Sequence, residues 1–259
     1  MTGKLSLIGC GPGVADLLTL RAIHRIQGAD LVLYDRLVEP EVLQFASCDA
    51  ELVYVGKQCT DGGRQQNDIN NIIQSSLIGG RQIVRLKSGD PMIFGRAAEE
   101  LAIAISVGAE TEIVPGVTAA LAAAAESGIA VTERAELQSF VVTTGRSSGK
   151  NKDPDWAELV KPGVCVAFYM SVAQSWRIQS ALMARGIPGH LNADWIENVG
   201  KRDCRWTRSR LDRLAHDAKQ AGVRNPAILF VRYPLSAVNS SEIPRAADQV
   251  YRASTSQDC

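Results

Sequence analysis

The chain has 259 residues, which is enough for one large α/β domain or for two modest domains with separate cores. Its 28 basic and 28 acidic residues give a formal net charge of zero, so no global field favours nucleic acid or an anionic membrane, and attraction for an anionic ligand must be local. No apolar run approaches the roughly 20 residues of a membrane-spanning helix, and the first residues show no signal-peptide pattern, which favours a cytoplasmic protein.

The first half of the chain predicts strands and helices in regular alternation. Short apolar runs predict strands, and apolar residues at helical spacing predict helices. The expected strands are 5–8, 31–34, 52–55, 83–86 and 112–114, and the expected helices are 19–27, 66–77 and 97–106. This alternation is typical of βαβ units in a parallel sheet.

The pattern changes after Pro115-Gly116, where an Ala-rich helix over 118–126 is expected. The later expected strands are 140–143, 164–168, 227–231 and, more weakly, 205–208, and the later expected helices are 175–185 and 211–220. Residues 145–155 predict a flexible loop. We therefore predict two α/β domains, 1–114 and 118–240, with a flexible tail over 241–259 and a ligand cleft between the domains.

The segment from Arg85 to Glu100 is the richest in candidate functional residues. It reads RLKSGDPMIFGRAAEE and joins an expected strand to an expected helix. Ser88-Gly-Asp-Pro91 predicts a tight turn, because Gly permits positive φ and Pro fixes φ. Crossovers at the carboxyl ends of strands are where ligands bind in open α/β sheets, so we expect a ligand site here.

The glycine-rich segment Gly9-Cys-Gly-Pro-Gly13 does not predict a dinucleotide site. Val14 stands where the G-x-G-x-x-G fingerprint has its third glycine, and Pro12 lacks a backbone donor. Two interpretations stay open: a tight turn at a strand end, or close backbone approach to a ligand that is not a pyrophosphate.

Charged residues follow two further expected strands. Asp35 and Arg36 end one strand and Lys57 ends the next, which favours a common cleft although each alone is typical of a solvated loop. Arginines suit bidentate binding of carboxylates, and four fall on expected loops or strand ends: Arg64, Arg96, Arg134 and Arg146. The histidines and six scattered cysteines show no metal-ligand spacing, so we expect no metal.

Taken in order over roughly residues 4–233, these segments resemble the tetrapyrrole methyltransferase superfamily. The segments around Asp35, Lys57 and Phe94-Gly-Arg96 resemble in particular the subfamily that methylates uroporphyrinogen III. The matching motifs are GCGPG with LLTL20, YDRLV38, VGK57, RLKSGDP with FGR96 and EE100, VPGVTA119, FYM170, EN198 and PAI228.

The resemblance implies the two-domain tetrapyrrole methylase fold of class III methyltransferases, with each domain an α/β sandwich, the active site in the interdomain cleft, and a homodimer. It implies that S-adenosylmethionine is the co-substrate and that two methyl groups are added to uroporphyrinogen III. The product would be precorrin-2, formed via precorrin-1, on the way to siroheme, cobalamin or haem d1. The alternative within the same fold is a C-methyltransferase that acts on a later precorrin. An RNA- or protein-modifying methyltransferase, a nucleotide-binding dehydrogenase and a silent binding protein are more distant alternatives.

The resemblance also implies roles for individual residues. Asp35 and Lys57 fall at proton-transfer positions, and Arg96 and Glu99 fall on the substrate side. The methyl donor would be held by Pro12, Ser88, Gly89, Asp90, Ile93, Thr118, Ala119, Met170 and Val199.

Several residues depart from the family pattern. Ser88 replaces a glycine, which requires a negative φ or backbone contacts at that position. Val199 replaces a small residue, so a contact there would be made by its backbone. Glu133 and Arg146 stand where histidines are common.

Overall fold

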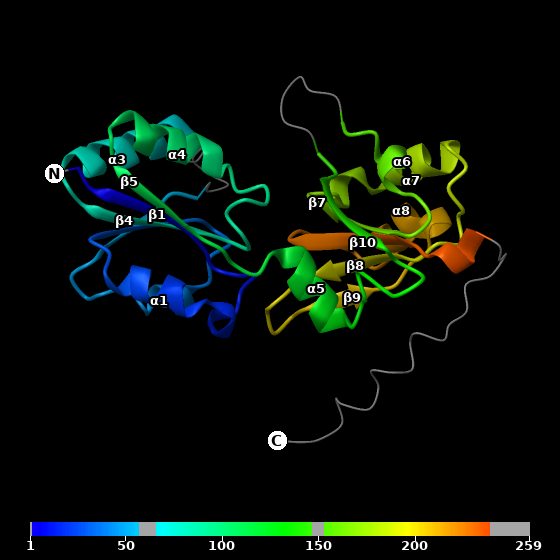
Figure 1. Cartoon of the computed structure of the whole chain (residues 1–259). Coiled ribbons are helices and arrows are strands. Elements are labelled where there is room, and N and C mark those ends of the chain that lie inside the picture. The colour runs from blue at the N-terminus through cyan, green and yellow to red at the C-terminus, as the bar shows by residue number, and fades with distance from the viewer. Residues whose placement is uncertain (1, 57–65, 147–152, 239–259) are drawn as a thin grey trace, which may run out of the picture. The chain divides into compact units, whose positions relative to one another are not determined.

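The computed structural model describes residues 2–56, 66–146 and 153–238. The chain divides into two compact units, Met1–Ala122 and Ala123–Cys259. Each unit contains one five-stranded sheet (Figure 1). The two sheets, each with helices packed on it, confirm the predicted α/β class.

The first sheet is entirely parallel. Its strand order is β3-β2-β4-β1-β5. Its strands are β1 (Lys4–Gly9), β2 (Leu31–Tyr34), β3 (Glu51–Tyr54), β4 (Gln82–Lys87) and β5 (Glu110–Val114). Because all five strands run the same way, all their carboxyl ends meet at one edge of the sheet, which we call the carboxyl edge. The opposite edge, where the strands begin, is the amino edge.

Four helices cover the first sheet: α1 (Leu20–Gln27), α2 (Pro40–Leu43), α3 (Gln66–Ile78) and α4 (Ala97–Ser106). Figure 1 shows α3 and α4 on one face and α1 on the other. Thr19 caps α1 by accepting a hydrogen bond from the Ala22 amide at 3.1 Å, and Gly28 ends the helix. Ile26 of α1 and Ile73 of α3 belong to separate buried clusters, one on each face of the sheet.

The second sheet is mixed, with strand order β6-β7-β10-β8-β9. Its strands are β6 (Ser139–Thr144), β7 (Val164–Tyr169), β8 (Ala193–Glu197), β9 (Arg205–Thr207) and β10 (Ala227–Tyr233). β6 pairs parallel with β7, while β10 runs antiparallel to both β7 and β8. Consequently β6, β7 and β8 end at the same edge of this sheet.

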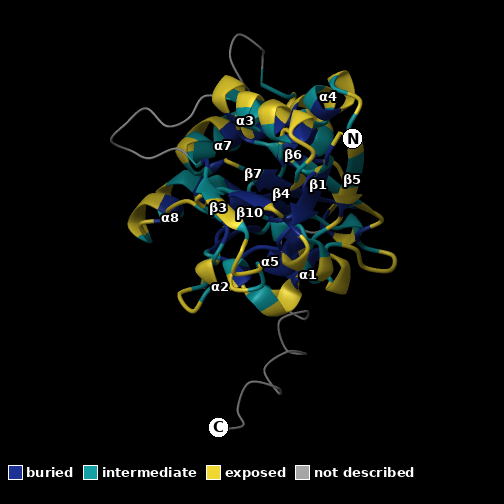
Figure 2. Ribbon diagram, turned by 90° about the vertical axis from the view of Figure 1, so that its left-hand side faces the viewer, coloured by how far each residue is buried: buried dark blue, intermediate teal, exposed yellow. Residues whose placement is uncertain are grey.

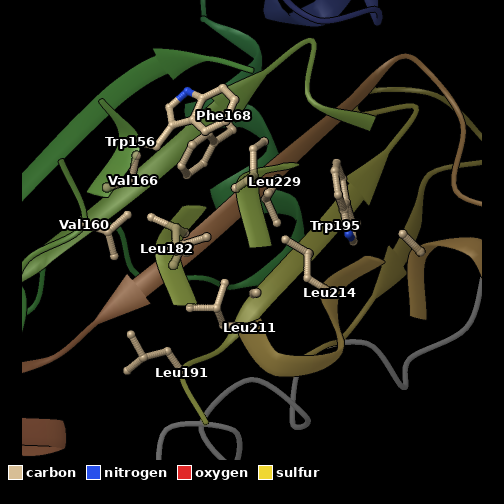
Figure 3. Packing of buried hydrophobic residues seen from close by; sticks show 14 of the residues in the cluster. Trp156, Val160, Val166, Phe168, Leu182, Leu191, Trp195, Leu211, Leu214 and Leu229 are labelled. Carbon is tan, nitrogen blue, oxygen red and sulfur yellow. The ribbon is translucent and has the colours of Figure 1, made fainter. Parts of the chain in front are cut away.

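The helices of the second half are α5 (Ala119–Ser127), α6 (Trp156–Leu159), α7 (Ser175–Ala184) and α8 (Leu214–Gln220). Side chains of α6, α7 and α8 join the sheet in one buried cluster, in which Phe168, Trp195 and Leu229 of the strands face the helices (Figure 3). Figure 2 shows that the buried residues concentrate in the strands and that the outer faces of the helices are exposed. Burial of large side chains of this kind is the main stabilising contribution in each unit.

The sequence-based predictions are correct for most elements and wrong for a few. Strand β8 and the four-residue helices α2 and α6 were not predicted, and the helix expected over 211–220 begins with a separate 3-10 turn, Leu211–Arg213. Most of the loop predicted over 145–155 and the whole tail predicted over 241–259 lie outside the described residues. No helix among the described residues combines the length and apolar character needed to cross a membrane.

Candidate functional site

A pocket of about 600 Å³ lies at the carboxyl edge of the first sheet. Its described walls come from the ends of β2, β3 and β4, from the start of α3, and from the segment before α4. Four of its lining residues carry positive charge, namely Arg36, Arg85, Lys87 and Arg96, whereas Asp35 is the one lining carboxylate among the described residues. We call it the cationic pocket. Arg36 and Arg96 are exposed, whereas Arg85 and Lys87 are buried, so the first two are the cations that suit an anionic ligand.

Beneath this pocket lies a buried charge cluster formed by Asp35, Arg85, Lys87 and Glu100. Arg85 and Lys87 are two residues apart on β4, so both side chains point to the same face of the sheet, toward Glu100 of α4. The side chains of Arg85 and Lys87 are only 3% and 5% exposed, and that of Glu100 is 0% exposed. Charged groups this deeply buried are rare unless they are paired.

Glu100 holds both cations through a single oxygen. Its Oε1 accepts hydrogen bonds from Lys87 Nζ at 2.7 Å and from Arg85 Nε at 3.3 Å. Gln66 Nε2 lies 3.4 Å from the same oxygen, while Oε2 has no hydrogen-bond partner. Burial lowers the pKa of Lys87, the charge of Arg85 lowers it further, and Glu100 opposes these effects.

The other end of Arg85 reaches the pocket wall. Its Nη2 donates to Asp35 Oδ2 at 2.8 Å, and its Nη1 donates to the Leu86 carbonyl at 2.8 Å. The Asp35 side chain is 33% exposed. The guanidinium therefore links a fully buried carboxylate to one that is accessible from the pocket.

The turn after β4 connects three loops of the carboxyl edge. Gly89 has a φ of 71° and exchanges two backbone hydrogen bonds with Gly11, at 2.6 and 3.2 Å. The Asp90 carboxylate accepts from the Met92 amide at 2.8 Å and from the Gly116 amide at 3.0 Å. Backbone hydrogen bonds thereby join the loops after β1 and β4, and the Asp90 side chain joins the loop after β5 to them.

Close backbone packing explains several of the glycines at this edge. A Cβ atom on Gly9 would lie 2.5 Å from the Gly116 nitrogen and 2.7 Å from the Gly89 oxygen, which is too close for any side chain. Gly11 has a φ of 70°. The segment 9–13 therefore forms a tight turn in close contact with the chain's own backbone. Ser88 is not among the residues with positive φ, so it meets the requirement expected for a serine at that position.

The segment before α4 has an unusual backbone conformation. Phe94 and Arg96 adopt left-handed φ values of 54° and 53°, which is uncommon for residues with side chains. Arg96 precedes α4 and forms two hydrogen bonds to Glu99, at 2.8 and 2.6 Å. Met92 and Phe94 are exposed apolar residues. The structure thus presents apolar and charged side chains together beside the cationic pocket.

The structure gathers most of the predicted site residues of the first unit at the carboxyl edge. Asp35, Ser88, Ile93 and Arg96 line the cationic pocket, and Glu99 is bonded to Arg96. The other predicted donor-binding residues lie on neighbouring loops or, for the last, at the start of α5: Pro12, Gly89, Asp90, Thr118 and Ala119. Lys57 and Arg64 lie outside the described residues.

Two predicted donor-binding residues belong to the second unit, where they follow β7 and β8 at the same edge of the sheet. Met170 has a φ of 53° and is about half exposed, whereas the Val199 side chain is buried. Asn198 also has a left-handed φ, of 51°, and its amide donates to the Pro226 carbonyl at 3.0 Å. The burial of Val199 is compatible with the expected contact through its backbone.

The sequence reasoning missed three residues that the structure places at the centre of this site. Arg85, Lys87 and Glu100 were part of the segment of interest, but no role was predicted for them. The available signal was two cations at alternate positions of a strand whose other buried residues are apolar, which places both on one buried face. Among residues 2–56, 66–146 and 153–238, no group of three or more His, Cys, Asp or Glu side chains could hold a metal ion.

Similarity to known proteins agrees with this geometry. Residues 4–215 match the family model described as Tetrapyrrole (Corrin/Porphyrin) Methylases. The chain is 40% identical over 229 residues to "Siroheme synthase 1" of Aeromonas hydrophila, covering 88% of this chain and 49% of the relative. It is 38% identical over 230 residues to "Siroheme synthase" of Methylococcus capsulatus, covering 88% and 48%. The chain therefore spans about half the length of these curated relatives.

Solved structures show the same fold. Uroporphyrin-III C-methyl transferase from Thermus thermophilus, complexed with S-adenyl homocysteine, has a TM-score of 0.76 and 31% sequence identity, over 92% of this chain and 94% of that one. A cobalt precorrin-4 methyltransferase has a TM-score of 0.77 at 24% identity, over 89% and 95%. At that lower identity the second likeness concerns the fold alone.

Proposed function

Because the chain belongs to the tetrapyrrole (corrin/porphyrin) methylase family, we propose that it transfers methyl groups from S-adenosylmethionine to uroporphyrinogen III. Two transfers give precorrin-2 by way of precorrin-1. The names of the siroheme synthase relatives and of the Thermus enzyme, whose structure holds S-adenyl homocysteine, support this choice. Methylation of a later precorrin is not favoured, because the cobalt precorrin-4 methyltransferase has the lower sequence identity to this chain, 24% against 31% for the Thermus enzyme.

The cationic pocket is the observation that carries the proposal. Uroporphyrinogen III has eight carboxylates, while the chain as a whole has no net charge. The substrate must therefore be attracted by local cations, and two exposed ones, Arg36 and Arg96, line this pocket. Arginine forms paired hydrogen bonds with carboxylates, so Arg36 and Arg96 are suited to hold the rim of the macrocycle.

The reaction does not require a nucleophile from the protein. A pyrrole carbon attacks the methyl group, the new C–C bond forms as the S–CH₃ bond breaks, and a proton then leaves the alkylated macrocycle. The chain's own contribution is alignment, which can supply about 7–11 kcal/mol, and proton transfer, typically worth about 10²–10⁴-fold. Asp35, on the pocket wall and fixed by Arg85, is the proposed base within the described residues, and Lys57 is proposed to assist.

The donor is proposed to bind at the carboxyl-edge loops. When bound, S-adenosylmethionine supplies a methyl group on a positively charged sulfur. The loop residues fit this role, because Gly9, Gly89 and Gly116 pack backbone against backbone and leave no side chains between the loops. Asp90 holds two of these loops in place through the Met92 and Gly116 amides. The proposed contacts are Pro12, Ser88, Gly89, Asp90, Ile93, Thr118 and Ala119, with Met170 and Val199 from the second unit.

The direct test is incubation of the purified chain with uroporphyrinogen III and methyl-labelled S-adenosylmethionine. We expect two labelled methyl groups on the macrocycle, detected by mass spectrometry. A matched incubation with the corresponding tetracarboxylate macrocycle tests whether the pocket selects for charge. Absence of label on uroporphyrinogen III would overturn the proposed activity.

A second test separates substrate binding from donor binding. Arg96→Ala is expected to abolish turnover while donor affinity, measured by calorimetry, changes little. Because the Arg96–Glu99 pair is about half exposed, its loss should cost less than about 1 kcal/mol of stability. A fall in donor affinity as large as the fall in turnover would contradict the substrate-side role of Arg96.

We further propose that the protein is a cytoplasmic homodimer whose product feeds siroheme, cobalamin or haem d1 synthesis. The family resemblance supports this assembly. Sedimentation velocity across a range of concentrations checks it: a monomer at all concentrations would exclude the dimer.

A further inference from the structure

We propose that Glu100 is a positioning residue for both sides of the cationic pocket. Through Arg85 it orients the Asp35 carboxylate, and through Lys87 it fixes the Gly95 carbonyl beside Arg96. The inference rests on the proposed function, in which Asp35 and Arg96 take part in the reaction. Glu100 itself is fully buried and does not line the pocket.

The first arm runs from Glu100 through Arg85. Glu100 Oε1 accepts from Arg85 Nε at 3.3 Å, the Leu86 carbonyl accepts from Nη1, and Asp35 Oδ2 accepts from Nη2 at 2.8 Å. All three nitrogens of the guanidinium are therefore engaged, so the plane of the group is set. A planar donor with a fixed orientation sets the orientation of the carboxylate it binds. The hydrogen bond from Nη2 consequently restrains the Asp35 carboxylate on the pocket wall.

The second arm runs from Glu100 through Lys87. Lys87 Nζ donates to Glu100 Oε1 at 2.7 Å and to the Gly95 carbonyl at 2.8 Å. Gly95 lies between Phe94 and Arg96, the two residues with left-handed backbone conformations. A Cβ atom on Gly95 would lie 2.3 Å from the Pro91 oxygen, so this short segment is tightly folded. The lysine thus ties the conformation of the segment that carries Arg96 to the same carboxylate.

Stability alone gives no reason for this arrangement. Burying a carboxylate and two cations is costly, and replacing such a group with apolar residues is often neutral or stabilising. In addition, Glu100 Oε2 is buried without a hydrogen-bond partner, which adds to the cost. A role in fixing the geometry of the pocket explains why the protein contains this cluster.

A double-mutant cycle tests the first arm. Arg85→Lys keeps the positive charge but removes the planar guanidinium. We expect it to lower kcat by about 10-fold or more, with donor affinity unchanged within about 2-fold. In the Asp35→Asn background, the same substitution should change kcat by less than about 2-fold, because its effect acts through Asp35. Residual turnover of Asp35→Asn is measured with labelled donor under single-turnover conditions.

Two further variants extend the test. Glu100→Gln keeps the shape of the side chain and is expected to lower kcat at least as much as Arg85→Lys. Lys87→Arg is expected to raise KM for uroporphyrinogen III by about 5-fold or more, because it displaces the Gly95 carbonyl. Arg25→Lys is the matched control: Arg25 makes a forked contact with Glu112 in the same unit, away from the pocket, and its variant should keep wild-type kcat.

The possible outcomes distinguish this inference from the proposed function. If wild-type protein transfers no methyl group to uroporphyrinogen III, both are overturned. Alternatively, the wild-type protein is active and Arg85→Lys lowers kcat by the same factor in the wild-type and the Asp35→Asn backgrounds. In that case only the positioning role is overturned. Urea unfolding of each variant checks folding. Should Glu100→Gln fail to fold, Arg85→Lys and Lys87→Arg still test the two contacts through which Glu100 acts, and unchanged kcat and KM in both variants would overturn the positioning role.

Discussion

The two edges of the first sheet carry similar sets of charges in different surroundings. At the carboxyl edge, Asp35, Arg85, Lys87 and Glu100 lie beneath a pocket of about 600 Å³. At the amino edge, a second set of two cations and two carboxylates lies beside a pocket of about 300 Å³ and consists of Lys4, Arg25, Glu110 and Glu112. The side chains of the first set are at most one-third exposed, whereas those of the second range from 17% to 71%.

From this difference we infer that the charges at the amino edge contribute to stability, whereas those at the carboxyl edge contribute to the functional site. Exposed pairs such as Lys4–Glu110 are weakened by water and contribute at most about 1 kcal/mol each, but they cost little to form. The buried set pays a large desolvation penalty and leaves one carboxylate oxygen without a partner. Of the two sets, only the buried one contains a proposed catalytic residue, Asp35.

The largest effect should come from replacing the buried set with apolar side chains. The triple variant Arg85→Met, Lys87→Met and Glu100→Leu is expected to lose methyl transfer. Its free energy of unfolding should stay the same or rise by about 1–4 kcal/mol, because three buried charges are removed together. Urea unfolding and the labelled-methyl assay measure the two quantities. A triple variant that keeps wild-type activity would show that the buried charges at the carboxyl edge are not needed for methyl transfer.

Removing one buried partner should have the opposite effect on stability. Lys87→Met leaves the fully buried Glu100 without its shortest hydrogen bond, and we expect the free energy of unfolding to fall by about 3–5 kcal/mol. Urea unfolding at neutral pH checks this value. A loss below 1 kcal/mol would mean that the cluster is effectively solvated.

The amino edge should respond to acid. Arg25 and Lys4 lower the pKa of Glu112 to about 2, below its usual value of 4.5. The folded protein therefore binds fewer protons than the unfolded chain in this range, so the stabilisation is fully present above about pH 4.5 and is lost as pH falls toward 2. In Glu112→Gln, the free energy of unfolding should fall less steeply over that interval. An unchanged slope would show that the pairing does not persist in solution.

The smallest effect is expected at Lys4, which pairs with the exposed Glu110 at 2.7 Å and with Glu112 at 3.2 Å. Lys4→Met should lower the free energy of unfolding by less than about 1 kcal/mol at neutral pH, and the loss should shrink further in high salt. It is the counterpart of Lys87→Met, since each substitution removes a β-strand lysine that binds a carboxylate. Equal losses in the two variants would contradict the comparison.

Hydrophobic periodicity predicted most of the fold because most elements bury continuous or regularly spaced apolar residues. Strand β8 was missed because its sequence, ADWIE, contains two carboxylates. Both are buried and bound by arginines: Arg232, 38 residues away in the sequence, lies 3.4 Å from Asp194, and Arg205, which follows in the next strand, forms a fork with Glu197. The sequence alone does not reveal those partners.

The residues of the site that lie in recognisable motifs were predictable from the sequence. Those whose role depends on how the side chains pack were not. The turn at Ser88–Asp90 and the strand-end Asp35 were identified from their sequence. Glu99 was selected through the family resemblance and its neighbour Glu100 was not, and the two side chains have different surroundings because adjacent helix residues point about 100° apart. In the structure Glu99 is exposed and pairs with Arg96, while Glu100 is buried against β4.

The backbone connections among the carboxyl-edge loops have a consequence for hydrogen exchange. The Gly11 and Gly89 amides donate to each other's carbonyls, and the Gly116 amide donates to Asp90. These protons should exchange with solvent only when the loops separate, unlike most loop amides. Their exchange rates would therefore report how often this edge opens, and a molecule bound across the loops should slow all three together.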